Sequence, residues 1–131
     1  MSEQEFSNCF ACGADNPIGL HLEFQFIDGE AVAEWNCLEV FDGYPNLIHG
    51  GIISTLLDEA MAKILHFDGI TAVTGKLNVS FRRPLNSGTM AKIVGKILEN
   101  KGRVITTSAQ IIVDDILIAE ANAIYIRVGK K

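Results

Sequence analysis

One segment of the 131-residue chain has the periodicity of a long, largely buried helix, and it limits the possible folds more than any other feature. Between residues 52 and 65, apolar side chains recur every three or four positions, which is the spacing of a wide helical face. These residues are Ile52, Ile53, Leu56, Leu57, Ala60, Met61, Ile64 and Leu65. A helix of this kind needs another layer of structure to pack against.

The remaining segments show the patterns of β-strands. Residues 20–26 and 30–37 flank a turn at Asp28 and Gly29, and apolar side chains alternate with polar ones in the first of them. Four longer β-like runs follow the helix at residues 71–83, 89–99, 103–113 and 116–128, and we expect a meander. An antiparallel sheet of this size needs its apolar face covered, and the helix is available to cover it. The sequence therefore predicts an α+β fold, with a six-stranded antiparallel sheet curled around one central helix, in a single domain of residues 1–131.

Composition and charge limit the environment and the partners. No apolar run approaches the roughly 18 to 20 residues of a membrane span, and the N-terminus lacks a signal-peptide pattern, so we expect a cytoplasmic protein without membrane contact. Residues 1–75 contain twelve acids and one lysine, a net charge of −11, whereas residues 76–131 contain ten bases and four acids, a net charge of +6. Because no Lys/Arg-rich run occurs, this asymmetry favours a local phosphate contact and not nucleic acid.

The start of the helix has the chemistry of an anion-binding site. His49 is followed by Gly50 and Gly51, which let another molecule approach the bare backbone. The N–H groups of a first helical turn have no intrahelical partner, and the helix dipole adds partial positive charge there. These N–H groups could stabilise an oxygen on which negative charge develops.

Two neighbouring acids on the helix have different surroundings. Glu59 lies outside the apolar arc, four residues before Lys63, which is the favourable spacing for a surface ion pair. Asp58 lies at the margin of the apolar arc, and the helix offers it no such partner. Burial can raise the pKa of a carboxylate toward a value suited to base chemistry, so Asp58 is the better catalytic candidate.

Several motifs together carry a resemblance to a known family. HGGIISTLLDEA resembles the PaaI-type branch of the 4-hydroxybenzoyl-CoA thioesterase superfamily, in which an acid stands at the ninth position after the His of HGG. The similarity extends through CFACGADNPIGL, GYPNLIHGG, TGKLNVSFRRP and the closing strands. It implies a hotdog fold and an acyl-CoA thioesterase, a hydrolase without a cofactor, in which residues 1–19 cover the substrate tunnel.

The resemblance also implies roles for individual residues. Asp58 would activate water as a general base or attack the thioester to form an anhydride, and the Gly50 N–H would be the principal oxyanion donor. Thr74, four residues before Asn78, would contribute a hydroxyl from the partner subunit of a homodimer or homotetramer. His49 could orient the loop or contact the thioester, and Asn46 could supply an amide to substrate or water.

Two further groups of residues have expected roles. We expect Gly51 to assist at the helix start, and four cations to bind the phosphates of CoA near the tunnel mouth: Arg82, Arg83, Lys101 and Arg103. Cys9 and Cys12 have the spacing of half a zinc ribbon, but a second pair is missing and His21 and Cys37 would have to complete the site. We therefore expect reduced packing thiols and no metal.

Two other functions are compatible with the same architecture. A non-catalytic acyl-CoA-binding module would keep the pocket and lose the acid, whereas Asp58 is present. A hotdog acyl dehydratase would use a His together with an acid on the acyl carbons. The position of His49 directly before the two glycines favours the thioesterase. The acyl group, and the choice between CoA and acyl-carrier protein as the thiol, stay open.

Overall fold

The computed structural model describes residues 6–128, and this range contains six strands and one long α-helix in the predicted order. Residues 1–5 and 129–131 of the predicted domain lie outside the described residues. Helix α1 spans Gly50–Phe67, and a short 3-10 helix, η2, spans Glu39–Phe41. The strands are β1 (Gln25–Ile27), β2 (Glu30–Asn36), β3 (Ala72–Phe81), β4 (Met90–Lys101), β5 (Val104–Val113) and β6 (Ile116–Arg127). No helix within residues 6–128 is long and apolar enough to cross a bilayer.

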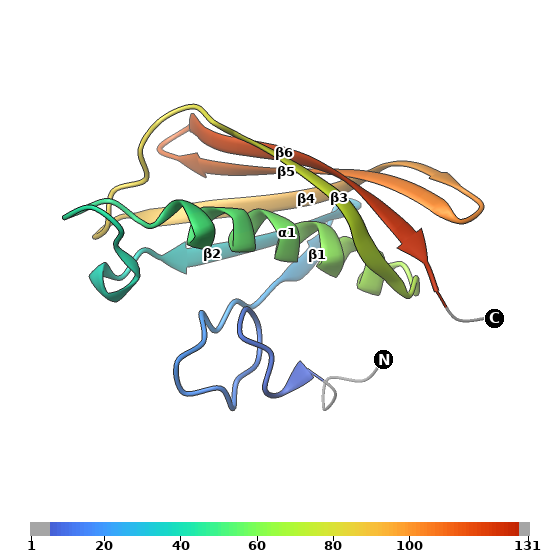
Figure 1. Ribbon diagram of the computed structural model, residues 1–131, viewed down its shortest axis with the longest axis horizontal. Helices are drawn as coiled ribbons and strands as arrows, with labels where there is room; N and C mark the ends of the chain where they lie inside the picture. The colour runs from blue at the N-terminus through green and yellow to red at the C-terminus, as the bar shows by residue number, and fades with distance from the viewer. Residues whose placement is uncertain (1–5, 129–131) are drawn as a thin grey trace.

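The six strands form one antiparallel sheet in the order β1-β2-β4-β5-β6-β3 (Figure 1). The prediction of a four-strand meander is wrong for β3, which pairs with β6 at the far edge of the sheet. Both sides of β4 are already occupied, by β2 and β5, so β3 has no free edge of β4 to join. The chain therefore crosses the end of the sheet between β3 and β4, and β3 becomes an edge strand.

The first predicted strand is shorter than the alternation in residues 20–26 indicated. The N–H groups of Leu20 and Leu22 donate to the carbonyl oxygens of Phe10 and Ala11, at 2.8 and 2.9 Å. His21 between them has a φ of 55°, in the left-handed region, which is incompatible with an extended strand. These residues therefore pair with the N-terminal segment, and the sheet begins only at Gln25.

Helix α1 packs its apolar face against the sheet and forms the centre of the core. Seven helix residues are buried: Ile53, Leu56, Leu57, Ala60, Met61, Ile64 and Leu65. The closest approach is at Gly95 of β4, where an added Cβ would lie only 2.3 Å from the carbonyl oxygen of Ala60. The absence of a side chain at Gly95 lets the helix lie directly on the sheet.

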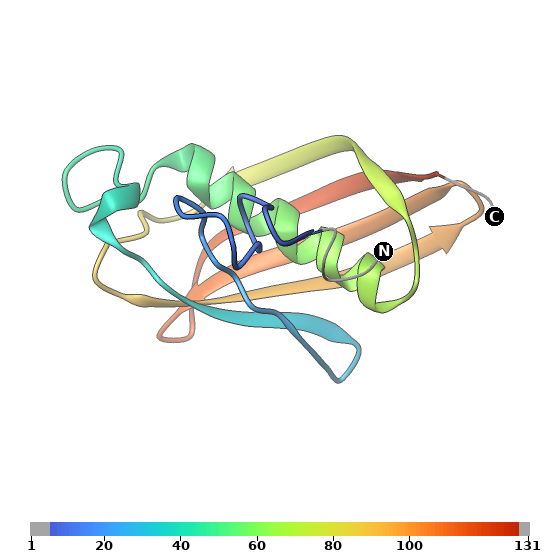
Figure 2. The ribbon, with the colours of Figure 1, turned by 90° about the horizontal axis from the view of Figure 1, so that it is seen from below.

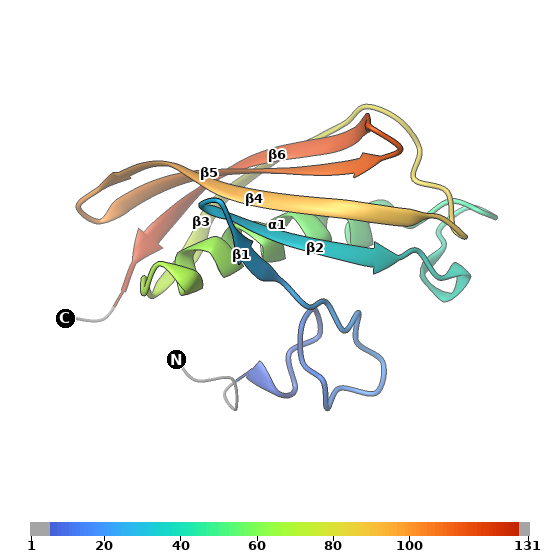
Figure 3. The same cartoon turned by 180° about the vertical axis from the view of Figure 1, so that it is seen from behind.

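The N-terminal segment, here residues 6–22, lies on the side of α1 that faces away from the sheet (Figures 2 and 3). Ala11, Leu20 and Leu22 are buried and belong to the same hydrophobic cluster as the helix. The Trp35 side chain anchors the segment because its Nε1–H donates to the Leu20 carbonyl oxygen at 3.0 Å. The helix is thus enclosed between the sheet and this segment.

Candidate active site

Asp58 lies in the middle of α1, and two hydroxyl groups from neighbouring strands converge on its carboxylate. The Tyr125 hydroxyl donates to Asp58 Oδ1 at 2.7 Å, and it also lies 3.0 Å from the Asp58 main-chain oxygen. The Thr74 hydroxyl donates to the same Oδ1 at 3.2 Å. Asp58 is half-buried, as its position at the margin of the apolar face predicted. The arrangement fixes one carboxylate oxygen and leaves Oδ2 without a hydrogen-bond partner among residues 6–128.

A β-bulge in β3 places Thr74 on the helix side of the sheet. The register between β3 and β6 shifts between Thr74 and Lys76, so that Thr74 pairs with Tyr125 and Leu77 pairs with Ala123. Tyr125 and Ala123 are both buried, two positions apart on the inner face of β6. Without an extra residue, positions 74 and 77 would point to opposite faces; the bulge at Gly75 brings both to the same face.

The Asp58 to Thr74 hydrogen bond joins residues of one chain. The resemblance implied that the Thr74 hydroxyl comes from the partner subunit, and the structure corrects this expectation. The physical reason is the register of β3 against β6, which presents Thr74 to the helix of its own chain.

Tyr125 is a site residue that the sequence reasoning missed. Burial raises the pKa of its hydroxyl, and the neighbouring Asp58 carboxylate raises it further. The hydroxyl therefore stays protonated at neutral pH and remains a donor. In the sequence Tyr125 occupies an inner position of an alternating strand, where an aromatic side chain is ordinarily a core residue, and only its polar end indicated that it needs a partner.

The start of α1 is capped by the side chain of His49. Its Nδ1 accepts a hydrogen bond from the Gly51 N–H at 2.8 Å, so Gly51 is not available to a bound oxygen. Both the Ile52 and Ile53 N–H groups donate to the His49 carbonyl oxygen. The Gly50 N–H has no hydrogen-bond partner among residues 6–128. Of the two predicted glycines, Gly50 is therefore the one that can bind an oxyanion.

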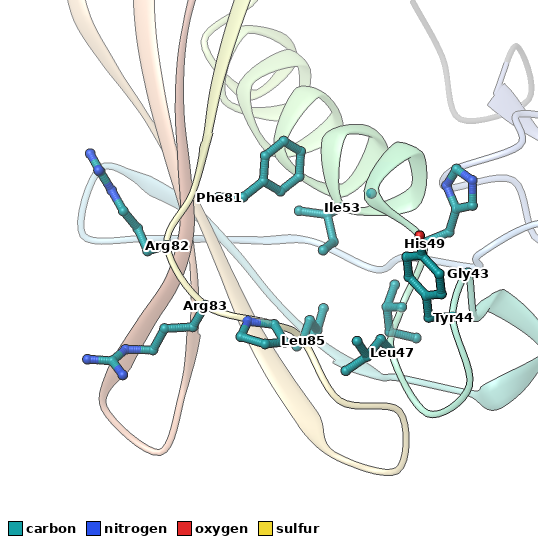
Figure 4. Close-up of a pocket in the computed structure, with 12 residues that line it drawn as sticks. Gly43, Tyr44, Leu47, His49, Ile53, Phe81, Arg82, Arg83 and Leu85 are labelled. Carbon is teal, nitrogen blue, oxygen red and sulfur yellow. The ribbon is translucent and has the colours of Figure 1, made fainter.

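A cavity of about 810 Å³ opens beside this helix start (Figure 4). Its walls come from the loop before the helix, from the first turn of α1 and from the end of β3. The apolar lining includes Leu47, Ile53, Phe81 and Leu85. The cavity is mainly apolar, with the His49 and Gly50 backbone at one side, which suits an acyl chain or the pantetheine arm of a thioester.

The four predicted phosphate-binding cations do not lie together in one chain. Arg82 and Arg83 line the cavity mouth, and Figure 4 shows their side chains directed away from His49. Lys101 and Arg103 lie at the hairpin between β4 and β5, at the opposite end of the sheet (Figure 1). The length of β4 separates the two pairs, because eleven residue steps of an extended strand span about 37 Å.

The two arginines at the cavity mouth differ in their partners. The Arg82 Nε and Nη2 atoms both lie 2.8 Å from Glu120 Oε2, so this guanidinium is held by a carboxylate. Arg83 forms no ion pair with another described residue. Arg83 is therefore the better placed of the two to bind a phosphate.

Asn46 is not brought to the cavity. Its φ of 68° places it in a tight turn, where its N–H donates to Asp42 Oδ2 at 3.0 Å and its carbonyl oxygen accepts from the Ser87 N–H. Asp42, which the sequence reasoning did not single out, has a buried Oδ1 without a hydrogen-bond partner among residues 6–128. Such an atom calls for a bound water or a ligand group.

The other candidate residues lie away from the Asp58 carboxylate. Glu59 and Lys63 form the predicted pair, with 4.0 Å between Oε2 and Nζ. His21 Nε2 lies 2.6 Å from the Asn16 carbonyl oxygen, and Cys37 is buried next to Trp35. Cys12 lies beside Cys9 and Glu59, and burial together with Glu59 raises the pKa of its thiol to about 12.

Comparisons with known proteins identify relatives of this chain. The model of the thioesterase superfamily matches residues 45–125. The acyl-coenzyme A thioesterase THEM4 of Xenopus laevis is 29% identical over 116 residues, which cover 83% of this chain and 52% of that protein. The chain spans about half the length of the curated relatives it matches.

Solved structures share the fold at low sequence identity. The PaaI protein of E. coli has a TM-score of 0.79 at 20% identity, covering 86% of this chain and 83% of its own. Smu.793 of Streptococcus mutans, solved with acetyl-CoA, has a TM-score of 0.78 at 19% identity, covering 84% and 90%. A hypothetical thioesterase of Streptococcus pneumoniae, solved as a threonine-to-alanine variant, has a TM-score of 0.78 at 16% identity, covering 83% and 91%. These likenesses confirm the predicted hotdog fold.

Proposed function

Because the chain belongs to the thioesterase superfamily, we propose that it hydrolyses an acyl-CoA to the free acid and CoA, with Asp58 as the catalytic carboxylate. The observation that carries this proposal is the convergence of the Thr74 and Tyr125 hydroxyls on Asp58 Oδ1. Two donors on one carboxylate oxygen hold the side chain in a single orientation. The opposite oxygen, Oδ2, is then presented to a reacting group.

The chemistry follows from this orientation. Asp58 Oδ2 takes a proton from a water molecule, whose oxygen attacks the thioester carbonyl carbon. The resulting oxyanion collapses to the carboxylic acid, the carbon–sulfur bond breaks, and the CoA sulfur receives the proton held by Asp58. Thr74 lies next to the same carboxylate oxygen and is close enough to help hold the water. We favour this route over an anhydride because the short Asp side chain leaves room for the water.

We propose that the oxyanion donor comes from a second chain. Gly50 and Asp58 are eight residues apart on α1, so they lie about 12 Å apart along its axis. A thioester carbonyl needs its oxygen near the donor and its carbon near the water, a few ångströms apart. We propose a homodimer in which two α1 helices run antiparallel, so that Gly50 of one chain faces Asp58 and Thr74 of the other. The unpaired edge of β3 is the surface through which the two sheets would join.

Relatives with the same fold support the choice of residues. In the hypothetical thioesterase of S. pneumoniae, the aspartate and the threonine that were each replaced by alanine lie sixteen residues apart. Asp58 and Thr74 have the same separation. THEM4 is an acyl-CoA thioesterase and Smu.793 was solved with acetyl-CoA, which favours CoA as the thiol of the substrate here.

The test is release of free thiol from short, medium, long and aromatic acyl-CoAs. Asp58→Asn keeps the size and hydrogen-bonding shape of the side chain but removes the base, so we expect kcat to fall by about 10²- to 10⁴-fold. Asp68→Asn, the same change at the exposed C-terminal end of α1, is the matched control and should leave kcat unchanged. If no acyl-CoA is hydrolysed but one still binds, a binding module replaces this proposal; hydration of an enoyl-CoA would identify a dehydratase instead.

A further inference from the structure

A cluster of potential metal ligands lies on the side of α1 away from the sheet. The Cys9 and Cys12 Sγ atoms and a carboxylate oxygen of Glu59 all lie within 4.8 Å of one another, and the three residues are half-buried. The cluster therefore joins the N-terminal segment to the helix.

The backbone of the N-terminal segment is shaped to bring the two thiols together. The Gly13 N–H donates to the Cys9 carbonyl oxygen at 2.8 Å, and the Cys9 N–H donates to the Phe6 carbonyl oxygen at 2.9 Å. A Cβ at Gly13 would lie 2.4 Å from the Cys9 nitrogen, so this turn requires glycine. This hydrogen-bonded turn therefore holds Cys9 and Cys12 side by side.

The donor set fits a zinc ion. Zinc binds thiolates at about 2.3 Å and carboxylate oxygens at about 2.0–2.2 Å in a tetrahedron, which places two sulfur ligands about 3.8 Å apart. Starting from a largest separation of 4.8 Å, the ligand atoms need to move by about 1 Å or less. Cys12 also lines a cavity of about 880 Å³ between the N-terminal segment, the end of α1 and β1–β2, from which water can supply the fourth ligand.

A zinc ion would balance the charges around the cluster. Two thiolates and a carboxylate around Zn²⁺ have a net charge of −1. Lys63 Nζ, 4.0 Å from Glu59 Oε2, adds one positive charge and makes the group neutral. The residues that the sequence suggested as completing ligands do not take part, since His21 contacts Asn16 and Cys37 contacts Trp35. The third potential ligand, Glu59, lies on the helix, and the spacing of the cysteines alone did not reveal it.

We propose that Cys9, Cys12 and Glu59 bind one zinc ion, with water as the fourth ligand, and that this ion fastens the N-terminal segment to helix α1. Within the described chain, this segment has few regular backbone hydrogen bonds to the rest of the molecule. A metal link therefore stabilises it more than it would stabilise a strand of the sheet.

The test uses the reduced full-length protein after removal of metal with a chelator. Titration with Co²⁺ should give one equivalent of binding with a sulfur-to-cobalt charge-transfer band, and Zn²⁺ should displace it. Zn²⁺ should raise Tm and protect residues 6–22 from limited proteolysis, and EDTA should reverse both effects. These measurements need no variant and do not depend on thioesterase activity.

Variants then assign the ligands. Cys9→Ser, Cys12→Ser and Glu59→Gln should each weaken Zn²⁺ binding by more than about tenfold, whereas Cys37→Ala, at a cysteine outside the cluster, should bind as the wild type does. Failure of the reduced protein to bind one equivalent of Zn²⁺ would overturn the proposal. Unchanged affinity in Glu59→Gln would also overturn it, as would a Cys9–Cys12 disulfide in a protein that binds no zinc after reduction.

Discussion

The Tyr125 hydroxyl lies 2.7 Å from Asp58 Oδ1, so the single tyrosine of β6 fixes the orientation of this helix carboxylate. Tyr125 is 1% exposed, and its ring is part of the hydrophobic core. One side chain therefore links the packing of the sheet to the position of the candidate catalytic carboxylate. Tyr125 is a positioning residue, because it acts on the substrate only through Asp58.

Replacing Tyr125 by Phe should impair the chemical step while the fold is kept. The ring stays in the core, and Asp58 Oδ1 retains only the Thr74 hydroxyl. Hydrogen bonds to charged groups contribute about 1.5–3 kcal/mol, so we expect kcat to fall by about ten- to a hundredfold. KM should change little, since Tyr125 does not line the cavity at the helix start. Steady-state kinetics with the best acyl-CoA would measure the two parameters, and a large rise in KM with unchanged kcat would contradict the assigned role.

Tyr125 should also make the protein sensitive to alkali. Its pKa is raised in the folded state by burial and by Asp58, while the unfolded chain ionises it near the ordinary value of about 10. Below pH 10 both states are protonated and the contribution to stability is complete. As the pH rises above 10, the unfolded state loses the proton first, and the free energy of unfolding falls by up to about 1.4 kcal/mol per pH unit. Urea denaturation from pH 8 to 11 should show this slope reduced in Tyr125→Phe but not in Tyr44→Phe, which changes the chain's other, exposed tyrosine.

The elements of the fold could be predicted from the sequence because their periodicity is local. The helix core at residues 52–65 and the existence of all six strands follow from side-chain spacing alone. The partner of β3 could not be predicted, because strand pairing depends on which edges the other strands leave free. The strand at residues 20–26 was too long in the prediction, since alternation does not reveal that Leu20 and Leu22 bond to the N-terminal segment.

Site residues within one segment could be predicted in the same way, whereas contacts between distant segments could not. Asp58 and Gly50 were identified from one helical segment, where spacing determines position. Tyr125 lies 67 residues after Asp58, and no local pattern distinguishes it from an ordinary core aromatic residue. Similarly, the charge pattern did not reveal that the length of β4 separates Lys101 from Arg83 within one chain.

The Gly50 N–H can be removed without disturbing the helix. Proline is favoured at the first helical position, and His49 has a φ of −58° and a ψ of 137°, which is the conformation that a residue before proline prefers. A Cβ at Gly50 meets only the Phe81 ring, at 3.8 Å. Gly50→Pro should therefore fold but lose an oxyanion donor, and kcat should fall by about 10²- to 10³-fold. Gly50→Ala keeps the N–H and is the matched control; equal losses in the two variants would show that space, and not the donor, matters.

Arg83 should contribute to CoA binding more than Arg82. Arg82 is paired with Glu120, whereas Arg83 has no such partner in the described range. We expect Arg83→Gln to raise KM for acyl-CoA by about three- to tenfold and Arg82→Gln to have a smaller effect. With an acyl-N-acetylcysteamine thioester, which lacks phosphates, the difference between the two variants should disappear. A persistent difference with that substrate would exclude phosphate binding as the cause.

Mixed dimers should show whether the two halves of the site come from different chains. Asp58→Asn chains keep Gly50, and Gly50→Pro chains keep Asp58, so each variant alone forms dimers with two defective sites. If the roughly 12 Å between these residues is bridged by a second chain, a mixed dimer contains one intact site and one doubly defective site.

Random re-association of equal amounts makes about half of the dimers mixed, and activity should return to about a quarter of the wild-type value. If Gly50 and Asp58 of the same chain act together, every site in the mixed dimer carries one defect, and mixing should restore no activity. Size-exclusion chromatography with light scattering, run on the same samples, would establish whether dimers are present.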